Sequence, residues 1–165
     1  MTAERRKRKH CRLRFAAAAS FAALFAAPLP ALAGLTQQIV VDWHSGLAIG
    51  GYDPVAFFTD RRPIAGSAAF ELRYGGVVWR FSNAGNRAAF GRRPDVYMPQ
   101  YGGYDPTGVA RGVAVPGSPD LWAIVGERLF LFYNGTEREQ FLADSARFIA
   151  ISQRRWPDVA RALDP

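Results

Sequence analysis

The chain has 165 residues and a formal net charge of +7, but seven of its 21 basic residues and one of its 14 acidic residues lie before Gly34. The rest of the chain, 34–165, carries 14 basic and 13 acidic side chains, a balance that gives no reason to expect nucleic acid or an anionic membrane as a partner. Cys11 also lies in the leading stretch, and the only histidine after it is His44. Thiol catalysis, cysteine-rich zinc sites and histidine clusters are therefore excluded for residues 34–165.

Residues 1–33 have the order of a secretory signal peptide. A basic segment at residues 5–9 precedes an apolar run at 15–27, two prolines, and the small–x–small pattern Ala31-Leu32-Ala33. This apolar run is too short for a membrane span, which needs about 20 residues. We therefore expect Sec-type export, cleavage after Ala33 and no stable membrane span. The product is expected to be periplasmic or secreted, with residues 34–165 forming a single domain.

The first predicted elements are a hairpin and a helix. Residues 70–74 alternate apolar and polar side chains, and residues 77–81 form a second β-type run after Gly75-Gly76. Two glycines between such runs predict a tight hairpin, because glycine tolerates the positive φ that the turn needs. Ser82 then predicts the N-cap of a helix over residues 83–92, which Pro94 ends.

The same order follows later in the chain. Residues 121–125 and 129–133 predict a second hairpin around residues 126–128. Thr136 and Glu139 fit a capping box, and the helix that they open has one apolar stripe, made of Phe141, Leu142, Phe148 and Ile149. A last short helix or turn carries Trp156-Pro157. This order predicts an α+β fold, in which two hairpins build a small antiparallel sheet and helices pack on one side.

The pentapeptide GGYDP occurs twice, at residues 50–54 and 102–106. A duplicated unit should keep its hydrophobic pattern even after its surface has changed. The segments that follow, VAFFTDRRPI and TGVARGVAVP, share no apolar register. We therefore interpret the repetition as convergence and not as a duplication.

Five segments occur in an order that resembles secreted bacterial YHS-domain proteins, over about residues 39–157: AIGGYDPVAFF, GVVWRFSNAGNRAAF, PQYGGY, VARG and LFYNGTEREQFLADSARFI. The resemblance implies an exported, non-enzymatic YHS-type binding module of the cell envelope. Shorter YHS domains carry metal-binding cysteines near these motifs, but this chain has Ala56 and Ser82-Asn83 at those places. Asp105 stands where secreted members have a cysteine. The thiolate metal site is thus missing, and its function does not transfer.

The candidate ligand-binding residues are Tyr52, Asp53, Tyr101, Tyr104 and Asp105. Each aspartate admits two interpretations: a ligand or base in a polar site, or a turn residue whose carboxylate binds nearby backbone N–H groups ahead of a proline. Residues 97–104 are the expected lining of a ligand groove, because glycines there allow close approach to the backbone. The alternative is that these aromatic residues fill the core.

A metal site and a hydrolase are the alternative functions. His44 and Met98 could form a weak copper site with a carboxylate, since copper accepts imidazole and thioether ligands. Asp53 and Asp105 could act together in hydrolysis, although nothing in the sequence places them at a useful separation. We expect no cofactor and no tight zinc binding. The expected partner is a small molecule, a metal ion or an envelope protein.

Overall fold

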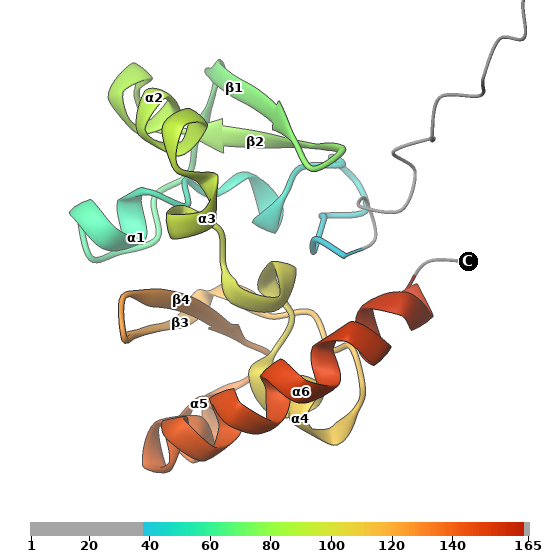
Figure 1. Ribbon diagram of the computed structural model, residues 1–165. Coiled ribbons are helices and arrows are strands. Elements are labelled where there is room, and N and C mark those ends of the chain that lie inside the picture. Colours follow the sequence, from blue (N-terminus) through green and yellow to red (C-terminus); the bar gives the residue numbers. More distant parts are fainter. Residues whose placement is uncertain (1–37, 164–165) are drawn as a thin grey trace, which may run out of the picture. The chain divides into compact units, whose positions relative to one another are not determined.

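The computed structural model describes residues 38–163, in which short helices alternate with two β-hairpins (Figure 1). In chain order the elements are η2 (Ile49–Gly51), α1 (Ala56–Thr59), β1 (Ser67–Tyr74), β2 (Val77–Phe81), α2 (Ala84–Arg92), α3 (Pro94–Tyr97), η3 (Gln100–Gly103), α4 (Pro106–Arg111), β3 (Ser118–Val125), β4 (Arg128–Phe132), α5 (Gly135–Ala143) and α6 (Ser145–Leu163). The α+β class and the two antiparallel hairpins are confirmed. Within residues 38–163 the hairpins form two separate two-stranded sheets. The expected signal peptide and its cleavage site lie outside the described residues.

Both hairpins have a tight turn and an irregularity at the same place. In the first, Ser67 lies opposite Phe81 and Glu71 lies opposite Arg80, so β1 bulges between them. The second hairpin repeats this register, with a bulge between Ser118 and Trp122. A bulge bends its strand and strengthens the twist. The two hairpins are therefore bent in the same way.

The helix boundaries differ from the sequence prediction at four points. Asn83 caps α2, where Ser82 was expected, and Asn134 caps α5, where Thr136 was expected. In each case the asparagine side chain accepts a hydrogen bond from the N–H three residues later. Asp144 divides the helix predicted after the second hairpin, so that Phe141 and Leu142 lie in α5 and Phe148 and Ile149 lie in α6. Trp156-Pro157 lies inside α6 and does not form a separate turn.

The backbone conformation that follows the first pentapeptide occurs again after the second. We call residues 49–92 the first repeat and residues 101–143 the second repeat. Each contains a short 3-10 turn over GG, a short helix, a bulged hairpin and an asparagine-capped helix. The backbone hydrogen bonds correspond as well: Gly66 N–H donates to Gly51 O, and Gly117 N–H donates to Gly103 O. The two pentapeptides therefore open equivalent structural units, and this arrangement favours duplication over the convergence that was interpreted from the sequence.

The two repeats differ most in the segment directly after each pentapeptide. The residues after the pentapeptide form a short helix and a loop, and this part is one residue shorter in the second repeat. The shared pattern lies further on, where Phe81-Ser82-Asn83 corresponds to Phe132-Tyr133-Asn134, and an arginine and a phenylalanine follow at equal spacing in both. Those phenylalanines, Phe90 and Phe141, pack against the rings of the preceding strand in each repeat.

Two hydrophobic cores follow from this arrangement. The first core contains the inner face of the first hairpin and α2, together with Leu129 and Leu131 from β4 of the second repeat. The second core contains Phe130 and Phe132 from the opposite face of β4, covered by α5 and α6. Figure 1 shows the β3–β4 hairpin between the first repeat and α6. β4 is thus buried on both faces, whereas β3 is mostly half-buried.

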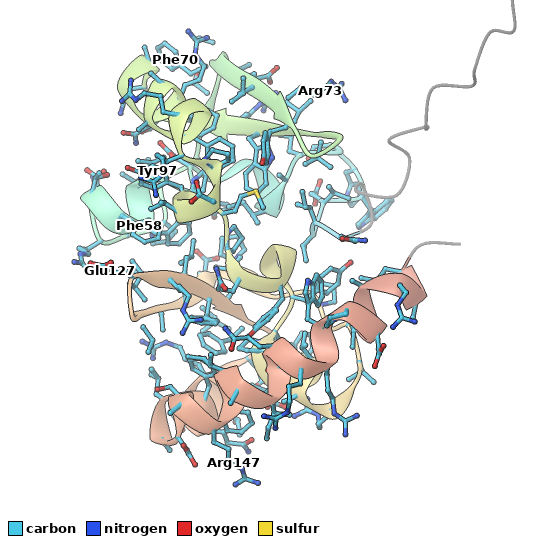
Figure 2. The ribbon with its side chains drawn as sticks, viewed as in Figure 1. Phe58, Phe70, Arg73, Tyr97, Glu127 and Arg147 are labelled. Carbon is cyan, nitrogen blue, oxygen red and sulfur yellow. The ribbon has the colours of Figure 1, made fainter. Side chains whose placement is uncertain are left out.

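The repeats therefore stack head to tail. The outer face of the second hairpin closes the core of the first repeat, and α6 closes the core of the second repeat in the place of a third hairpin. The corresponding outer face of the first hairpin is polar, with Arg80 paired to Glu71 at 2.8 Å. Arg73 extends outward from this face (Figure 2). A polar end face and a covering helix stop a stack of repeats from continuing.

Candidate functional site

Asp53 lies at the centre of a hydrogen-bond network in the first repeat. It has no exposed surface. Its Oδ1 accepts from the Val55 N–H at 2.9 Å, while its Oδ2 accepts from the N–H and hydroxyl of Ser82 and from Asn86 Nδ2 at 2.8, 2.7 and 2.7 Å. The carboxylate joins the pentapeptide to the start of α2, which is distant from it in the chain. This is the geometry of a turn-anchoring aspartate.

Asp105 has the equivalent position in the second repeat. Its Oδ1 accepts from the N–H and hydroxyl of Thr107 at 2.8 and 2.7 Å, and its Oδ2 accepts from the Tyr133 N–H at 2.8 Å. Only 1% of the residue is exposed. Tyr133 corresponds to Ser82, so the two carboxylates hold the same junction in the two repeats. Neither carboxylate presents surface to a ligand.

The second repeat adds an ion pair to this network. The Thr107 hydroxyl lies 2.7 Å from Asp105 Oδ1 and 2.6 Å from Glu137 Oε2, so two carboxylates share its single proton. Arg111 donates to both oxygens of Glu137, at 3.2 and 3.1 Å. The hydrogen bond from Arg111, followed by that from Thr107, holds the pKa of Glu137 below its usual value. The first repeat has the neutral Asn86 at this position.

The three candidate tyrosines belong to the cores. Tyr52 packs against the first core, whereas Tyr101 and Tyr104 lie in the second core, with their rings 5.6 and 6.0 Å from Trp156. Burial raises the pKa of Tyr101 and Tyr104 above its usual value, and for Tyr101 the nearby Ser152 hydroxyl opposes the shift. These positions favour the interpretation that the aromatic residues fill the core.

Tyr101 also carries two unfavourable features. Its backbone has a φ of 54°, in the left-handed region that non-glycine residues rarely adopt. Its buried hydroxyl has no hydrogen bond of acceptable geometry within residues 38–163, and the neighbouring Ser152 hydroxyl donates to Pro106 O at 2.7 Å. In the first repeat Ile49 occupies the same left-handed position with an apolar side chain.

His44 and Met98 lie in different surroundings. His44 is exposed, in a turn where its ring stacks on Trp43. Met98 is half-buried and packs against the first core. Residues 38–163 contain no group of three His, Cys, Asp or Glu side chains that could hold a metal ion. In the same part of the chain no helix is both long and apolar enough to cross a bilayer.

A cavity of about 340 Å³ lies beside the second pentapeptide, and we call it the aromatic hollow. Its lining is Gln38, Ile39, Tyr74, Gly75, Met98, Gly102 and Trp156. None of these side chains is charged. Predominantly apolar and aromatic lining of this size is typical of small-molecule sites.

Gly102 fixes the wall of the aromatic hollow. Its φ is 63°, and a Cβ at this position would lie 1.7 Å from Gln38 O. The Val40 N–H donates to Gly102 O at 2.8 Å. Only glycine allows residues 38–40 to pass so close to this backbone.

The aromatic hollow contains only part of the lining expected from the sequence. Met98 and Gly102 fall within the expected lining, residues 97–104. Ile39, Tyr74 and Trp156 were missed as lining residues, because they come from three distant segments. The only sequence signal for Tyr74 was its position directly before the Gly75-Gly76 turn. That position does not show which distant residues lie beside it.

No family model, curated protein or solved structure matches this chain.

Proposed function

We propose that this protein is an exported, non-enzymatic binding module of the cell envelope, which holds a small, neutral, largely aromatic molecule in the aromatic hollow. The observation that carries the proposal is the lining: the rings of Tyr74 and Trp156, the thioether of Met98 and no charged group. A thioether makes favourable contacts with aromatic rings. An ionic ligand would lose its hydration there without gaining a counter-charge.

A binding role is also supported by the state of the two aspartates. A hydrolase would need a carboxylate that reaches its substrate, and both Asp53 and Asp105 are buried and occupied by hydrogen bonds. The resemblance to secreted YHS-domain proteins and the signal-peptide order of residues 1–33 support export. Cleavage after Ala33 is checked by the intact mass of the protein from the cell envelope.

The test uses N-phenyl-1-naphthylamine, a neutral aromatic probe that fluoresces in apolar surroundings. We expect saturable binding of one equivalent to the purified protein. Tyr74→Ala removes a ring from the hollow at a position that is already 42% exposed, so the fold should be retained. This change should weaken binding by about fivefold, which corresponds to the loss of one aromatic contact.

The matched control is Trp43→Ala. Trp43 is 84% exposed and does not line the hollow, so its loss should leave the dissociation constant unchanged. Equal binding by the parent and the Tyr74→Ala protein would refute the assignment. So would an equal loss in the Trp43→Ala protein, because it would indicate adsorption to exposed rings.

A further inference from the structure

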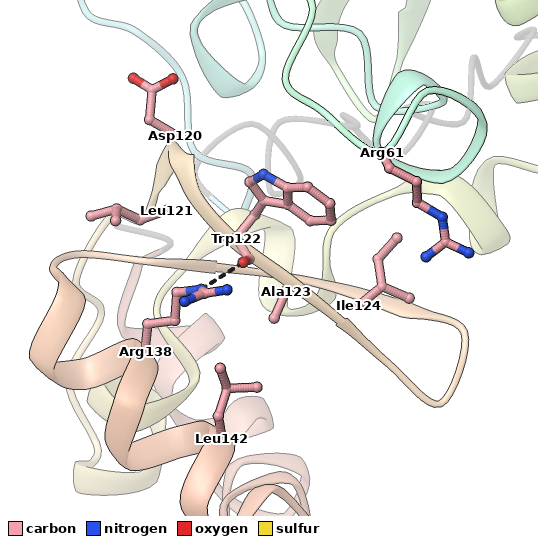
Figure 3. Close-up of a pocket in the computed structure, with 8 residues that line it drawn as sticks. All are labelled: Arg61, Asp120, Leu121, Trp122, Ala123, Ile124, Arg138 and Leu142. Atoms are coloured by element: carbon pink, nitrogen blue, oxygen red, sulfur yellow. Dashed lines mark hydrogen bonds between the residues drawn. The ribbon is translucent and has the colours of Figure 1, made fainter.

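A second cavity, of about 460 Å³, lies where the two repeats meet, and we call it the junction hollow (Figure 3). Its lining is Arg61, Asp120, Leu121, Trp122, Ala123, Ile124, Arg138 and Leu142. Arg61 belongs to the loop after α1 in the first repeat, and the others belong to β3 and α5 of the second repeat. The indole of Trp122 also contacts the ring of Phe57, at 5.4 Å between centroids. The junction hollow is therefore formed by the packing of the second repeat against the first.

Two guanidinium groups reach this hollow without an acidic partner. Arg138 Nε donates to Trp122 O at 2.8 Å, as drawn in Figure 3, and this bond fixes the side chain while leaving both terminal nitrogens for other partners. Neither Arg138 nor Arg61 forms an ion pair with any residue between 38 and 163. Asp120 is the one acidic residue of the lining. The hollow thus has an excess of positive charge beside an aromatic wall.

The backbone of Arg61 gives an independent indication. Its φ is 55°, although non-glycine residues rarely adopt left-handed backbone. The left-handed residue after the corresponding helix of the second repeat is Gly112, with φ 85°. Glycine takes this conformation without a steric cost. The first repeat therefore keeps an arginine at a position whose backbone favours glycine.

The residues of the first repeat that correspond to this lining differ in chemistry. Glu71 stands where the second repeat has Trp122, and it is already paired with Arg80. Arg87 corresponds to Arg138 but is exposed and has no ion pair with a described residue. The combination of an anchored arginine, an indole and a second arginine is specific to the junction.

We propose that the junction hollow binds a small organic oxyanion, a carboxylate or a phosphate monoester with an aromatic body. The oxyanion would bind Arg61, since a guanidinium group binds carboxylates and phosphates through paired N–H donors. Arg138, on the other side of the β3 ribbon in Figure 3, adds positive charge to the same cavity. The aromatic body would lie against Trp122 and Ile124. This site is separate from the aromatic hollow and does not depend on the function proposed for it.

The test is a titration followed by nuclear magnetic resonance, because it assigns binding to a place. Benzoate and phenyl phosphate are added separately, and benzyl alcohol serves as the neutral counterpart. The Trp122 indole N–H reports on the junction hollow, and the Trp156 indole N–H reports on the aromatic hollow. We expect both anions to shift the Trp122 signal saturably, and the stronger of the two identifies the headgroup. Benzyl alcohol should bind the junction at least tenfold more weakly.

The deciding variant is Arg61→Gly. It removes one guanidinium and gives the left-handed position its preferred residue, so the melting temperature should equal or exceed that of the parent while anion binding weakens by about tenfold. Arg87→Gln removes one charge from the corresponding helix of the first repeat and should leave binding within twofold. Unchanged binding in the Arg61→Gly protein overturns the proposal. The same follows from equal loss in both variants, from equal binding of benzyl alcohol, or from no anion-dependent shift of Trp122.

Discussion

The two hairpins have the same register and the same bulge, yet their outer faces carry opposite chemistry. On the first hairpin this face holds the ion pair of Arg80 with Glu71, with about a third of each side chain exposed. The second hairpin has Leu131 and Trp122 at these positions, and Leu131 has no exposed surface. The backbone is common to both repeats, whereas burial of the outer face depends on the neighbour in the stack.

This difference shows how the stack ends. A head-to-tail interface joins two different surfaces. Each repeat added to such a stack therefore leaves one surface uncovered at the free end. In this protein the outer face of the first hairpin is polar, and α6 covers the open side of the second core. Exchanging or removing corresponding residues of the two repeats tests this difference.

The largest effect is expected from Leu131→Arg, which places on the second hairpin the residue of the first. The new charge would be buried without a partner, at a cost of more than about 4 kcal/mol. Total stabilities are about 5–15 kcal/mol, so we expect a protein with little cooperative unfolding in urea. The reverse change, Arg80→Leu, should alter the free energy of unfolding by no more than about 1 kcal/mol, because the pair that it removes is partly exposed. Similar losses in both variants would contradict the head-to-tail arrangement.

The next effect concerns the two anchoring carboxylates. Asp53→Ala leaves the N–H groups of Val55 and Ser82 and the amide of Asn86 without their acceptor, and it should cost about 3 kcal/mol or more in urea unfolding. Asp105→Ala should cost slightly less, because fewer groups lose their partner. Asp120→Ala is the control, with an exposed carboxylate and an expected change within about 0.5 kcal/mol. If Asp53→Ala and Asp120→Ala were equally stable, the networks would not hold the repeats together.

A smaller effect on stability is expected from alanine at the first glycine of each pentapeptide, Gly50 or Gly102. Gly50→Ala places a Cβ 3.8 Å from the ring of Tyr52, which is ordinary contact, and its cost should be the left-handed strain of about 1 kcal/mol. Gly102→Ala meets backbone at 1.7 Å and should cost several times more. It should also alter binding in the aromatic hollow, where Gly102 is a wall residue. Equal melting temperatures for the two variants would show that residues 38–40 do not pass Gly102 as described.

The smallest effect is the pH dependence that Glu137 of the second repeat contributes to stability. The folded state lowers the pKa of Glu137 from 4.5, so its contribution to stability is present above that value and is lost as the pH falls through the folded pKa. Urea midpoints at pH 7 and pH 3 should therefore differ less in Glu137→Gln than in the parent. Glu139→Gln, on the exposed side of the same helix, should keep the parent's difference. If the Glu137→Gln protein kept the parent's full difference between the urea midpoints at pH 7 and pH 3, the ion pair would not contribute to the pH dependence of stability.

Local patterns predicted the local structure. The glycine pair at 75–76 identified the first turn, and alternation identified both hairpins. The predicted helix starts were displaced because serine, threonine and asparagine are all suitable N-cap residues. Only the path of the chain decides between Ser82 and Asn83, and between Thr136 and Asn134. The apolar face of Leu131 and Trp122 gave no sign that it covers another repeat, since a strand buried on both faces resembles any apolar run.

The candidate residues were harder to interpret. Asp53 and Asp105 were chosen as candidates because they are polar residues in a repeated motif. Their carboxylates instead accept hydrogen bonds that join two segments of each repeat. The lining of both hollows depends on contacts between distant segments. Arg61, for example, lies among ordinary loop residues in the sequence, and only its left-handed backbone and its place in the junction hollow with Trp122 distinguish it.

The placement of α6 also constrains the order of folding. The first core needs Leu129 and Leu131, so it stays incomplete until β4 has been made, and the second core then remains open until α6 arrives. A nascent chain that ends before β4 would expose Trp79 and Phe81 without their cover. Although its units look alike, the protein would thus fold as one cooperative whole. If the chain is exported as proposed, the interval before α6 is made is the period in which it stays compatible with passage through a translocation channel.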